Sequence, residues 1–297
     1  MFGSQILDVV FGLIFVFWLL SLICLTLNEW IARIFALRSK TLEAGIQNLI
    51  NGKDKDGNEL LKLFYEHHLI KRLNRPGKEL SGGNKPSYIS SQDFALVLID
   101  ILAPKDNAHP KGLDDINEAA LNLPEGDTKK ALLLLIKEAG NDYAKLHENI
   151  EKWFDQTMDR VSGWYKRKIQ LITLVVALIV SVGLNVDTFM LSNGLYRDAS
   201  LRATVVAAAS EAAKQPGAVH TDSSLNEIKT IKSELEQLNV PMGWSGQSLK
   251  SFTTLQWVSK IFGWLFTTFA LFLGAPFWFD VLSKFTNLRS TGVKPKQ

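Results

Sequence analysis

Three stretches of the chain contain no charged residue over the length that a helix needs to cross a bilayer. They are residues 9–27, 169–186 and 261–279. A hydrocarbon core about 30 Å thick requires roughly 20 apolar residues in a helix, and aromatic or basic residues flank each stretch, as expected at a lipid-water boundary. We therefore expect an integral membrane protein with three transmembrane helices, at residues 1–36, 166–187 and 259–283.

Composition limits the classes of function. Charged residues make up 21% of the chain, and a net charge of +3 is too small to indicate a nucleic-acid-binding protein. The single cysteine, Cys24, lies inside the first apolar stretch, which excludes an intramolecular disulfide and a metal site built from cysteines. We expect no cofactor, no bound metal and no nucleic acid, and the lipid bilayer is the first expected partner.

Lysine and arginine predict the orientation, because they concentrate on the cytoplasmic side of membrane helices. Such residues follow the first stretch, precede the second and follow the third, whereas the opposite ends are poorer in them. The pattern predicts an outside amino terminus and a cytoplasmic carboxy terminus with a basic tail at 284–297. A cleaved signal peptide is disfavoured, because no basic region precedes the first stretch.

The larger region outside these stretches, residues 37–165, predicts a helical cytoplasmic domain, so the expected fold class is all-α. Apolar residues recur there every three or four positions. Ser90 followed by Asp93 resembles a helix N-cap with its partner. After Gly140 the pattern continues into the second stretch without a proline, which predicts one long helix. The other helical segments are 41–50, 60–73, 92–102, 113–121 and 128–139.

Residues 188–258 predict a small exoplasmic helical hairpin. An alanine-rich segment at 203–213 is the first candidate helix. In the second, a narrow apolar stripe favours packing between neighbouring helices over a ligand groove. A loop at 241–251 leads back to the third stretch. The stripe consists of Leu225, Ile228, Ile231, Leu235 and Leu238.

The segment before the second stretch predicts an interfacial collar of aromatic, acidic and basic residues. Its carboxylates form, with Glu151, an acidic row at four-residue spacing, and its three consecutive cations can reach anionic headgroups. The row fits a metal or a basic partner, but we favour ion pairing with Arg160 and neighbouring helices. The collar residues are Trp153, Asp155, Asp159, Trp164, Lys166, Arg167 and Lys168.

Carboxylates near the ends of the apolar stretches are further site candidates. Glu29 and Asp280 fall near the predicted cytoplasmic boundary, where Arg33 and Arg160 are also expected. A carboxylate within a membrane raises a transport or proton-relay hypothesis. Pairing with arginine at the interface costs little, so we favour a structural polar cluster. At the opposite boundary, hydrogen bonding at a helix end is expected for Asn185, Asp187 and Arg197.

Four runs of sequence resemble a widespread bacterial inner-membrane family that has no assigned activity. The resemblance extends over nearly the whole chain and implies a bacterial inner-membrane protein with the three-span layout. It supplies no catalytic residue. The runs are LNEWIAR at 27–33, WFD at 153–155 followed by MDRVSGWYKR at 158–167, LNVDT at 184–188 and GAPFWFD at 274–280.

Motifs of catalysis and metal binding do not favour an enzyme. Residues 54–58 imitate the start of a calcium loop, but Glu59 stands where that loop requires glycine. The adjacent His67 and His68 would point about 100° apart on a helix, which disfavours a joint metal site.

We therefore expect a non-catalytic membrane anchor or scaffold that acts through a protein partner or as a homo-oligomer. Two alternatives stay open. One is an oligomeric channel or membrane-perturbing effector that uses the boundary carboxylates. The other is an enzyme at the level of the lipid headgroups that uses Asp155 and Asp159.

Overall fold

A computed structural model describes residues 4–51, 59–74, 85–102, 112–214, 225–244 and 253–291, and every element in these ranges is a helix. The all-α prediction is confirmed. The calcium-like run at 54–58 and most of the loop predicted at 241–251 lie outside the described residues. The chain divides into two compact units: unit 1 is Met1–Ile31 with Ile169–Gln297, and unit 2 is Ala32–Lys168.

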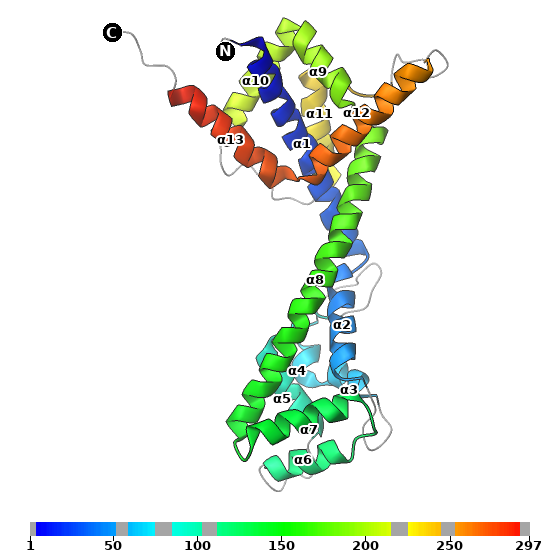
Figure 1. Cartoon of the computed structure of the whole chain (residues 1–297), viewed down its shortest axis with the longest axis vertical. Coiled ribbons are helices and arrows are strands. Elements are labelled where there is room, and N and C mark those ends of the chain that lie inside the picture. Colours follow the sequence, from blue (N-terminus) through cyan, green and yellow to red (C-terminus); the bar gives the residue numbers. More distant parts are fainter. Residues whose placement is uncertain are drawn as a thin grey trace. The chain divides into compact units, whose positions relative to one another are not determined.

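Unit 1 contains the apolar stretches (Figure 1). In the described residues it is built from α1 (Gln5–Ile34), the part of α8 (Tyr143–Gly183) that begins at Ile169, α9 (Thr188–Arg197), α10 (Ala199–Ala212), α11 (Leu225–Gln237), α12 (Thr254–Phe272) and α13 (Ala275–Thr291).

The first helix is the one described helix that is long and apolar enough to cross a membrane by itself. It has 30 residues, which corresponds to about 45 Å at 1.5 Å per residue. The pairs α8–α9 and α12–α13 also satisfy the test when each bent pair is taken as one span, so the chain has between one and three candidate spans. A membrane-span helix is thus confirmed by length and composition.

The α8–α9 break lies at the end of the second predicted span, whereas the α12–α13 break lies inside the third. The second predicted span ends as helix at Gly183, and α9 follows at an angle of 50°. The third is divided at Gly274, whose φ of +85° suits glycine, and α13 leaves at 88° from α12. Pro276 lies in the first turn of α13, where the missing N–H breaks no helical hydrogen bond.

The helix α1 is an interior element of unit 1. Of its most apolar 18-residue stretch, 83% is buried. A Cβ atom at Gly12 would lie 3.3 Å from both Leu195 of α9 and Val205 of α10, so these helices approach closely there. Farther along α1, the Thr26 hydroxyl donates to Glu227 of α11 at 3.3 Å. The segment predicted as an exoplasmic hairpin therefore contacts α1 at two points that lie 14 residues, or about 21 Å, apart.

Large apolar side chains of α8 and α12 are exposed on the outside of unit 1. Phe266, for example, is 56% exposed. Soluble proteins rarely expose contiguous apolar patches of this kind, and larger ones mark membrane or protein contact. We call these side chains the apolar outer surface. It comprises Leu171, Val175, Leu178 and Ile179 on α8 and Ile261, Phe262, Leu265, Phe266 and Phe269 on α12.

Unit 2 has a separate hydrophobic core. Its described helices are α2 (Leu37–Leu49), α3 (Leu60–Glu66), α4 (His68–Lys71), α5 (Ser91–Leu102), α6 (Leu113–Leu121), α7 (Asp127–Ala139) and the first part of α8.

The core of unit 2 is built around aromatic side chains. Phe64, Phe94 and Phe154 are buried, and the Phe94 ring lies 4.6 Å from Phe154 and 5.4 Å from Phe64 between centroids. At the start of α5, the Asp93 N–H donates to Ser90 Oγ at 3.0 Å, and Ser90 Oγ donates to Asp93 at 2.8 Å. The recurrence of apolar residues every three or four positions thus accounts for the helices of unit 2 and for the faces that they bury.

Close packing between α2 and α8 inside unit 2 gives a first prediction. A Cβ atom at Gly45 would lie 2.7 Å from Val161 Cγ2 and 3.0 Å from Met158 Cε. Gly45→Val should therefore overpack this contact and lower the free energy of unfolding by about 1–3 kcal/mol. Gly163→Ala on α8 is the matched control, because nothing lies within 4 Å of its Cβ position. Thermal unfolding in mild detergent compares the two, and equal stability of both variants would contradict the packing.

Candidate functional site

The junction between α8 and α9 holds several buried polar side chains. Asn185 and Asp187 are both buried there, and Asn185 has a positive φ of 49°. The Asp187 carboxylate caps α9 by accepting from the N–H groups of Phe189 at 2.8 Å and Met190 at 3.4 Å. The structure therefore places two of the three predicted helix-end residues in one junction.

Residues 243 and 244, which precede α12, form hydrogen bonds with the end of α8. Asn185 Nδ2 donates to the carbonyl oxygen of Gly243 at 2.7 Å, and the Gly243 N–H donates to Leu184 O at 2.7 Å. The indole N–H of Trp244 donates to Val182 O at 3.1 Å. Because the last carbonyl groups of a helix have no partner within it, these bonds complete the end of α8 inside an apolar unit.

The other side of the junction is α12. Ser181 Oγ donates to Trp264 O at 3.3 Å, and the hydroxyls of Thr188 and Thr267 are hydrogen-bonded at 2.9 Å. Gly263 contacts the Asp187 carboxylate so closely that a Cβ atom at this glycine would overlap it. A small residue at 263 is therefore required for α12 to approach the junction.

The cation of the junction is Lys260, which is only 6% exposed. Its Nζ lies 5.6 Å from the ring centroid of Trp264 and 5.8 Å from that of Trp244, within reach of cation–π attraction. Asp187 interacts with it electrostatically. Opposite charges and aromatic faces together compensate the burial of Lys260, which would otherwise be costly.

The sequence did not reveal the roles of Lys260, Gly263 and Trp244. In the sequence, Lys260 directly precedes the third apolar stretch, where a basic residue is ordinary at a lipid-water boundary. The available signal was the four-residue spacing of Lys260 and Trp264, which places both on one helix face. Arg197 is exposed at the end of α9, and it is Arg202 whose guanidinium bonds the carbonyl groups of Leu195 and Tyr196, at 2.8 and 2.9 Å.

A surface depression of about 580 Å³ adjoins the junction. It is lined by the end of α8, by α11 and by residues 239–244, and includes Lys232, Glu236, Asn239 and Trp244. Lys232 and Glu236 are paired with each other at 3.5 Å, and about half of each side chain is exposed. The charges in the depression thus neutralise each other, so it offers no uncompensated charge from this pair to a ligand.

The four residues of the predicted boundary cluster are all exposed. Glu29 and Asp280 belong to unit 1, whereas Arg33 and Arg160 belong to unit 2. Arg160 Nη2 donates to Thr157 Oγ1 at 3.4 Å within α8. Pairing between the carboxylates and the arginines stays a prediction.

The predicted collar lies on α8. Trp153 is half-buried near Phe94, with 6.5 Å between ring centroids, whereas Trp164 is 43% exposed. The remaining collar residues, Asp155, Asp159, Lys166, Arg167 and Lys168, are exposed.

Glu151 of the acidic row and the nearby Glu148 each form an ion pair within α8. Glu151 meets His147 at 3.0 Å, and Glu148 meets Lys152 at 2.6 Å, both at four-residue spacing. The hydrogen bond and charge of Lys152 lower the pKa of Glu148. The described residues contain no group of three His, Cys, Asp or Glu side chains that could hold a metal ion.

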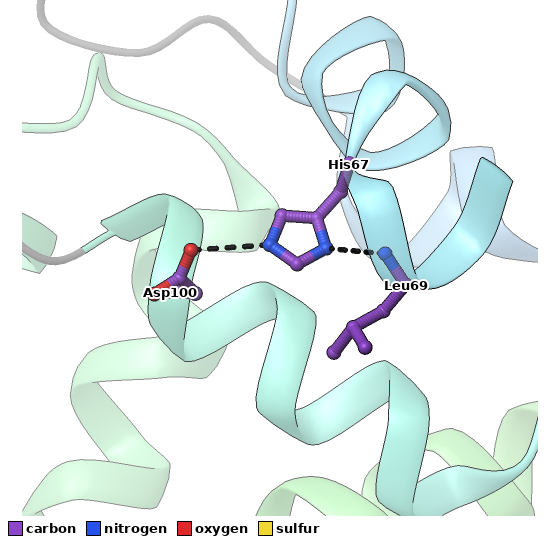
Figure 2. A network of polar contacts seen from close by, with 3 residues as sticks. All are labelled: His67, Leu69 and Asp100. Atoms are coloured by element: carbon purple, nitrogen blue, oxygen red, sulfur yellow. Dashed lines mark hydrogen bonds and ion pairs between the residues drawn. The ribbon is translucent and has the colours of Figure 1, made fainter. Parts of the chain in front are cut away.

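A polar contact in unit 2 links three helices through His67 (Figure 2). His67 lies between α3 and α4, and its Nδ1 accepts the N–H of Leu69 at 3.3 Å. This assigns the ring proton to Nε2, which lies 3.1 Å from Asp100 Oδ2 on α5. The imidazole thus caps α4 and fixes it to α5, and it divides the segment predicted as one helix at 60–73.

Tyr65 forms a second polar contact in unit 2. The ammonium of Lys85 lies 4.7 Å from its ring centroid and pairs with Glu43. Burial, aided by the negative charge of Glu43, raises the pKa of the Tyr65 hydroxyl. A phenol with a raised pKa is protonated at neutral pH and is a poor general base, so this cluster favours a structural role.

The fold and the junction define an all-helical protein with at least one membrane-capable helix, whose buried polar groups close the ends of broken helices. Comparisons with protein-family models, with curated proteins and with solved structures find no match.

The contact between Gly263 and Asp187 gives a second prediction. Gly263→Ala should displace the Asp187 carboxylate from α12 and lower the free energy of unfolding by about 1–3 kcal/mol. Gly183→Ala, at the end of α8, is the control because nothing lies within 4 Å of its Cβ position. Thermal unfolding in mild detergent measures both. Full stability of Gly263→Ala would show that Asp187 is not held against α12.

Proposed function

We propose that the chain is a non-catalytic anchor or scaffold of the bacterial inner membrane. The observation that supports this best is the division into two compact units with different surfaces. Unit 1 carries the apolar outer surface, and unit 2 has its own core of buried aromatic and aliphatic side chains. A helical unit with a separate core, joined to a membrane-embedded unit, suits the presentation of a protein surface at the membrane.

The bonding of the polar side chains favours a protein-binding role over catalysis. In unit 1, the buried side chains of Asn185, Asp187 and Ser181 each bond backbone groups. In unit 2, His67 caps a helix, and the pKa of the Tyr65 hydroxyl is raised. A reactive site needs a nucleophile or base held ready for substrate, and these groups are committed to the fold.

The membrane orientation and the source are part of the proposal. The basic residues around 33–40 and 160–168 favour a cytoplasmic unit 2 and an outside amino terminus. The resemblance in runs such as LNEWIAR and GAPFWFD supports a bacterial inner membrane. The cytoplasmic position expected for the carboxy terminus requires α12–α13 to cross as one bent span.

An oligomeric channel is the second candidate, and α11 favours it. This helix contacts α1 at Thr26 yet exposes Lys229, Lys232 and Glu236. A charged helix beside a membrane-crossing helix must face water or protein, because charges are costly in hydrocarbon. Copies of the chain could enclose that face. Ser181 and Asn185 do not line such a path, since both are buried and bonded to backbone carbonyls.

Crosslinking in intact cells separates the two candidates. The full chain is purified in mild detergent, and the mass of the complex is measured. A scaffold predicts a stoichiometric complex with another protein that disappears in Phe94→Asp, because a charge in the core of unit 2 unfolds it. The exposed Lys130→Ala is the control.

Two results contradict the scaffold. One is partner recovery that is unchanged in Phe94→Asp while the variant remains in the membrane fraction. The other is a discrete homo-oligomer without any partner, which favours the channel and calls for conductance measurements in liposomes.

A further inference from the structure

We infer that the third apolar segment does not cross the membrane but enters and leaves it on one side, as a re-entrant pair formed by α12 and α13. The carboxy-terminal helix then lies on the same side as the amino terminus. This rests on the proposed membrane position of unit 1 but not on its role as a scaffold. All contacts that carry it lie within unit 1.

The bend between the two helices is built into the fold. The axes of α12 and α13 differ by 88°, and Gly274 at the bend has a φ of +85°. The indole N–H of Trp278 donates to Ala270 O at 2.6 Å, which ties the start of α13 to the end of α12. A broken helix in lipid must satisfy its freed backbone groups internally, and this bond satisfies one of them.

The direction of α13 follows from its aromatic contacts with α1. Trp278 and Phe279 lie against Phe17 and Trp18, with 5.2 and 6.0 Å between the respective ring centroids. Farther along α13, Phe285 lies 6.4 Å from Phe11. Increasing residue number on α13 thus corresponds to decreasing residue number on α1. The helix runs back toward the amino-terminal end of α1, as Figure 1 shows.

The bend lies beside the middle of α1. From Phe17 to the first helical residue, Gln5, is about 18 Å, and from Phe17 to Ile34 is about 26 Å at 1.5 Å per residue. A single bent span would carry α13 onward to the Ile34 end. Instead α12 and α13 diverge from the bend on the same side of unit 1 (Figure 1).

An independent contact marks which side this is. Gln5 Nε2 donates to Tyr196 O at 2.7 Å, which places the end of α9 and the start of α10 at the amino-terminal end of α1. Phe11, the partner of Phe285, lies less than two turns from Gln5. The end of α13, with the exposed Lys284, is therefore displayed with the start of α10.

This arrangement changes which partners the carboxy-terminal helix can meet. In a three-span protein, Lys284 would face the same compartment as unit 2. In the re-entrant arrangement it faces the compartment of α10, so proteins or anionic headgroups bound by this end come from that side. The basic tail then no longer contributes to the charge bias of the unit 2 side.

Cysteine accessibility tests the inference. Single cysteines replace Lys284, Ser200 of α10 and Lys62 of α3 in a Cys24→Ala chain, which removes the native thiol. All three positions are exposed. Spheroplasts are treated with a membrane-impermeant maleimide before and after permeabilisation. A cysteine appended after Gln297 repeats the measurement without altering any packed residue.

The re-entrant pair predicts that Lys284→Cys and Ser200→Cys are labelled from the same side of the membrane, and that Lys62→Cys is labelled from the opposite side. If Ser200→Cys is labelled in intact spheroplasts as fully as after permeabilisation, Lys284→Cys should be too. Labelling of Lys284→Cys together with Lys62→Cys would overturn it and restore the three-span topology. If all three label on one side, α1 and α8 do not cross the membrane, and the proposed membrane position fails with the inference.

Discussion

The described helices of unit 1 are organised around the buried helix α1. This helix is the one described helix that is long and apolar enough to cross a membrane by itself, and side chains such as Phe11, Phe15 and Leu20 are fully buried. Helices α9, α10, α11 and α13 each contact it. An apolar helix covered by other helices does not itself form most of the lipid contact. In a bilayer, most of that contact would fall to the apolar outer surface of α8 and α12.

Two helix pairs of unit 1 are bent at breaks, and polar side chains bond backbone groups at both breaks. A chain that bends inside an apolar environment leaves carbonyl and N–H groups without helical partners. Asn185, Trp244 and Asp187 supply those partners at the α8–α9 break. Trp278 does so at the α12–α13 break. The geometry of the backbone at the α8–α9 break thus explains the buried polar side chains of Asn185 and Asp187.

Periodicity made much of this fold predictable. Apolar spacing located α6 at its observed limits of Leu113–Leu121, and the lack of a proline after Gly140 indicated the long helix α8. Ser90 and Asp93 marked the start of α5, because a cap depends only on local sequence.

Contacts between helices were harder to predict from the sequence. The bend at Gly274 was hidden because an uninterrupted apolar run reads as one span, although Gly274 and Pro276 are local signals for a break. Lys260 and Asp187 meet only through the packing of α12 on α9, which no local pattern encodes. His67 divides a segment of helical periodicity, because its ring bonds a backbone N–H and a carboxylate on another helix. The Glu29, Arg33, Arg160 and Asp280 cluster stays a prediction.

Photolabelling of the protein in native membranes tests whether α1 is shielded from lipid inside unit 1. A lipid-soluble diazirine inserts into any C–H bond that meets the hydrocarbon, and mass spectrometry locates the labelled residues without any substitution. Insertion is expected on residues 171–179 of α8 and 261–272 of α12, and protection is expected on residues 14–24 of α1. Labelling of α1 as heavy as that of α12 would contradict the packing of α1 inside unit 1.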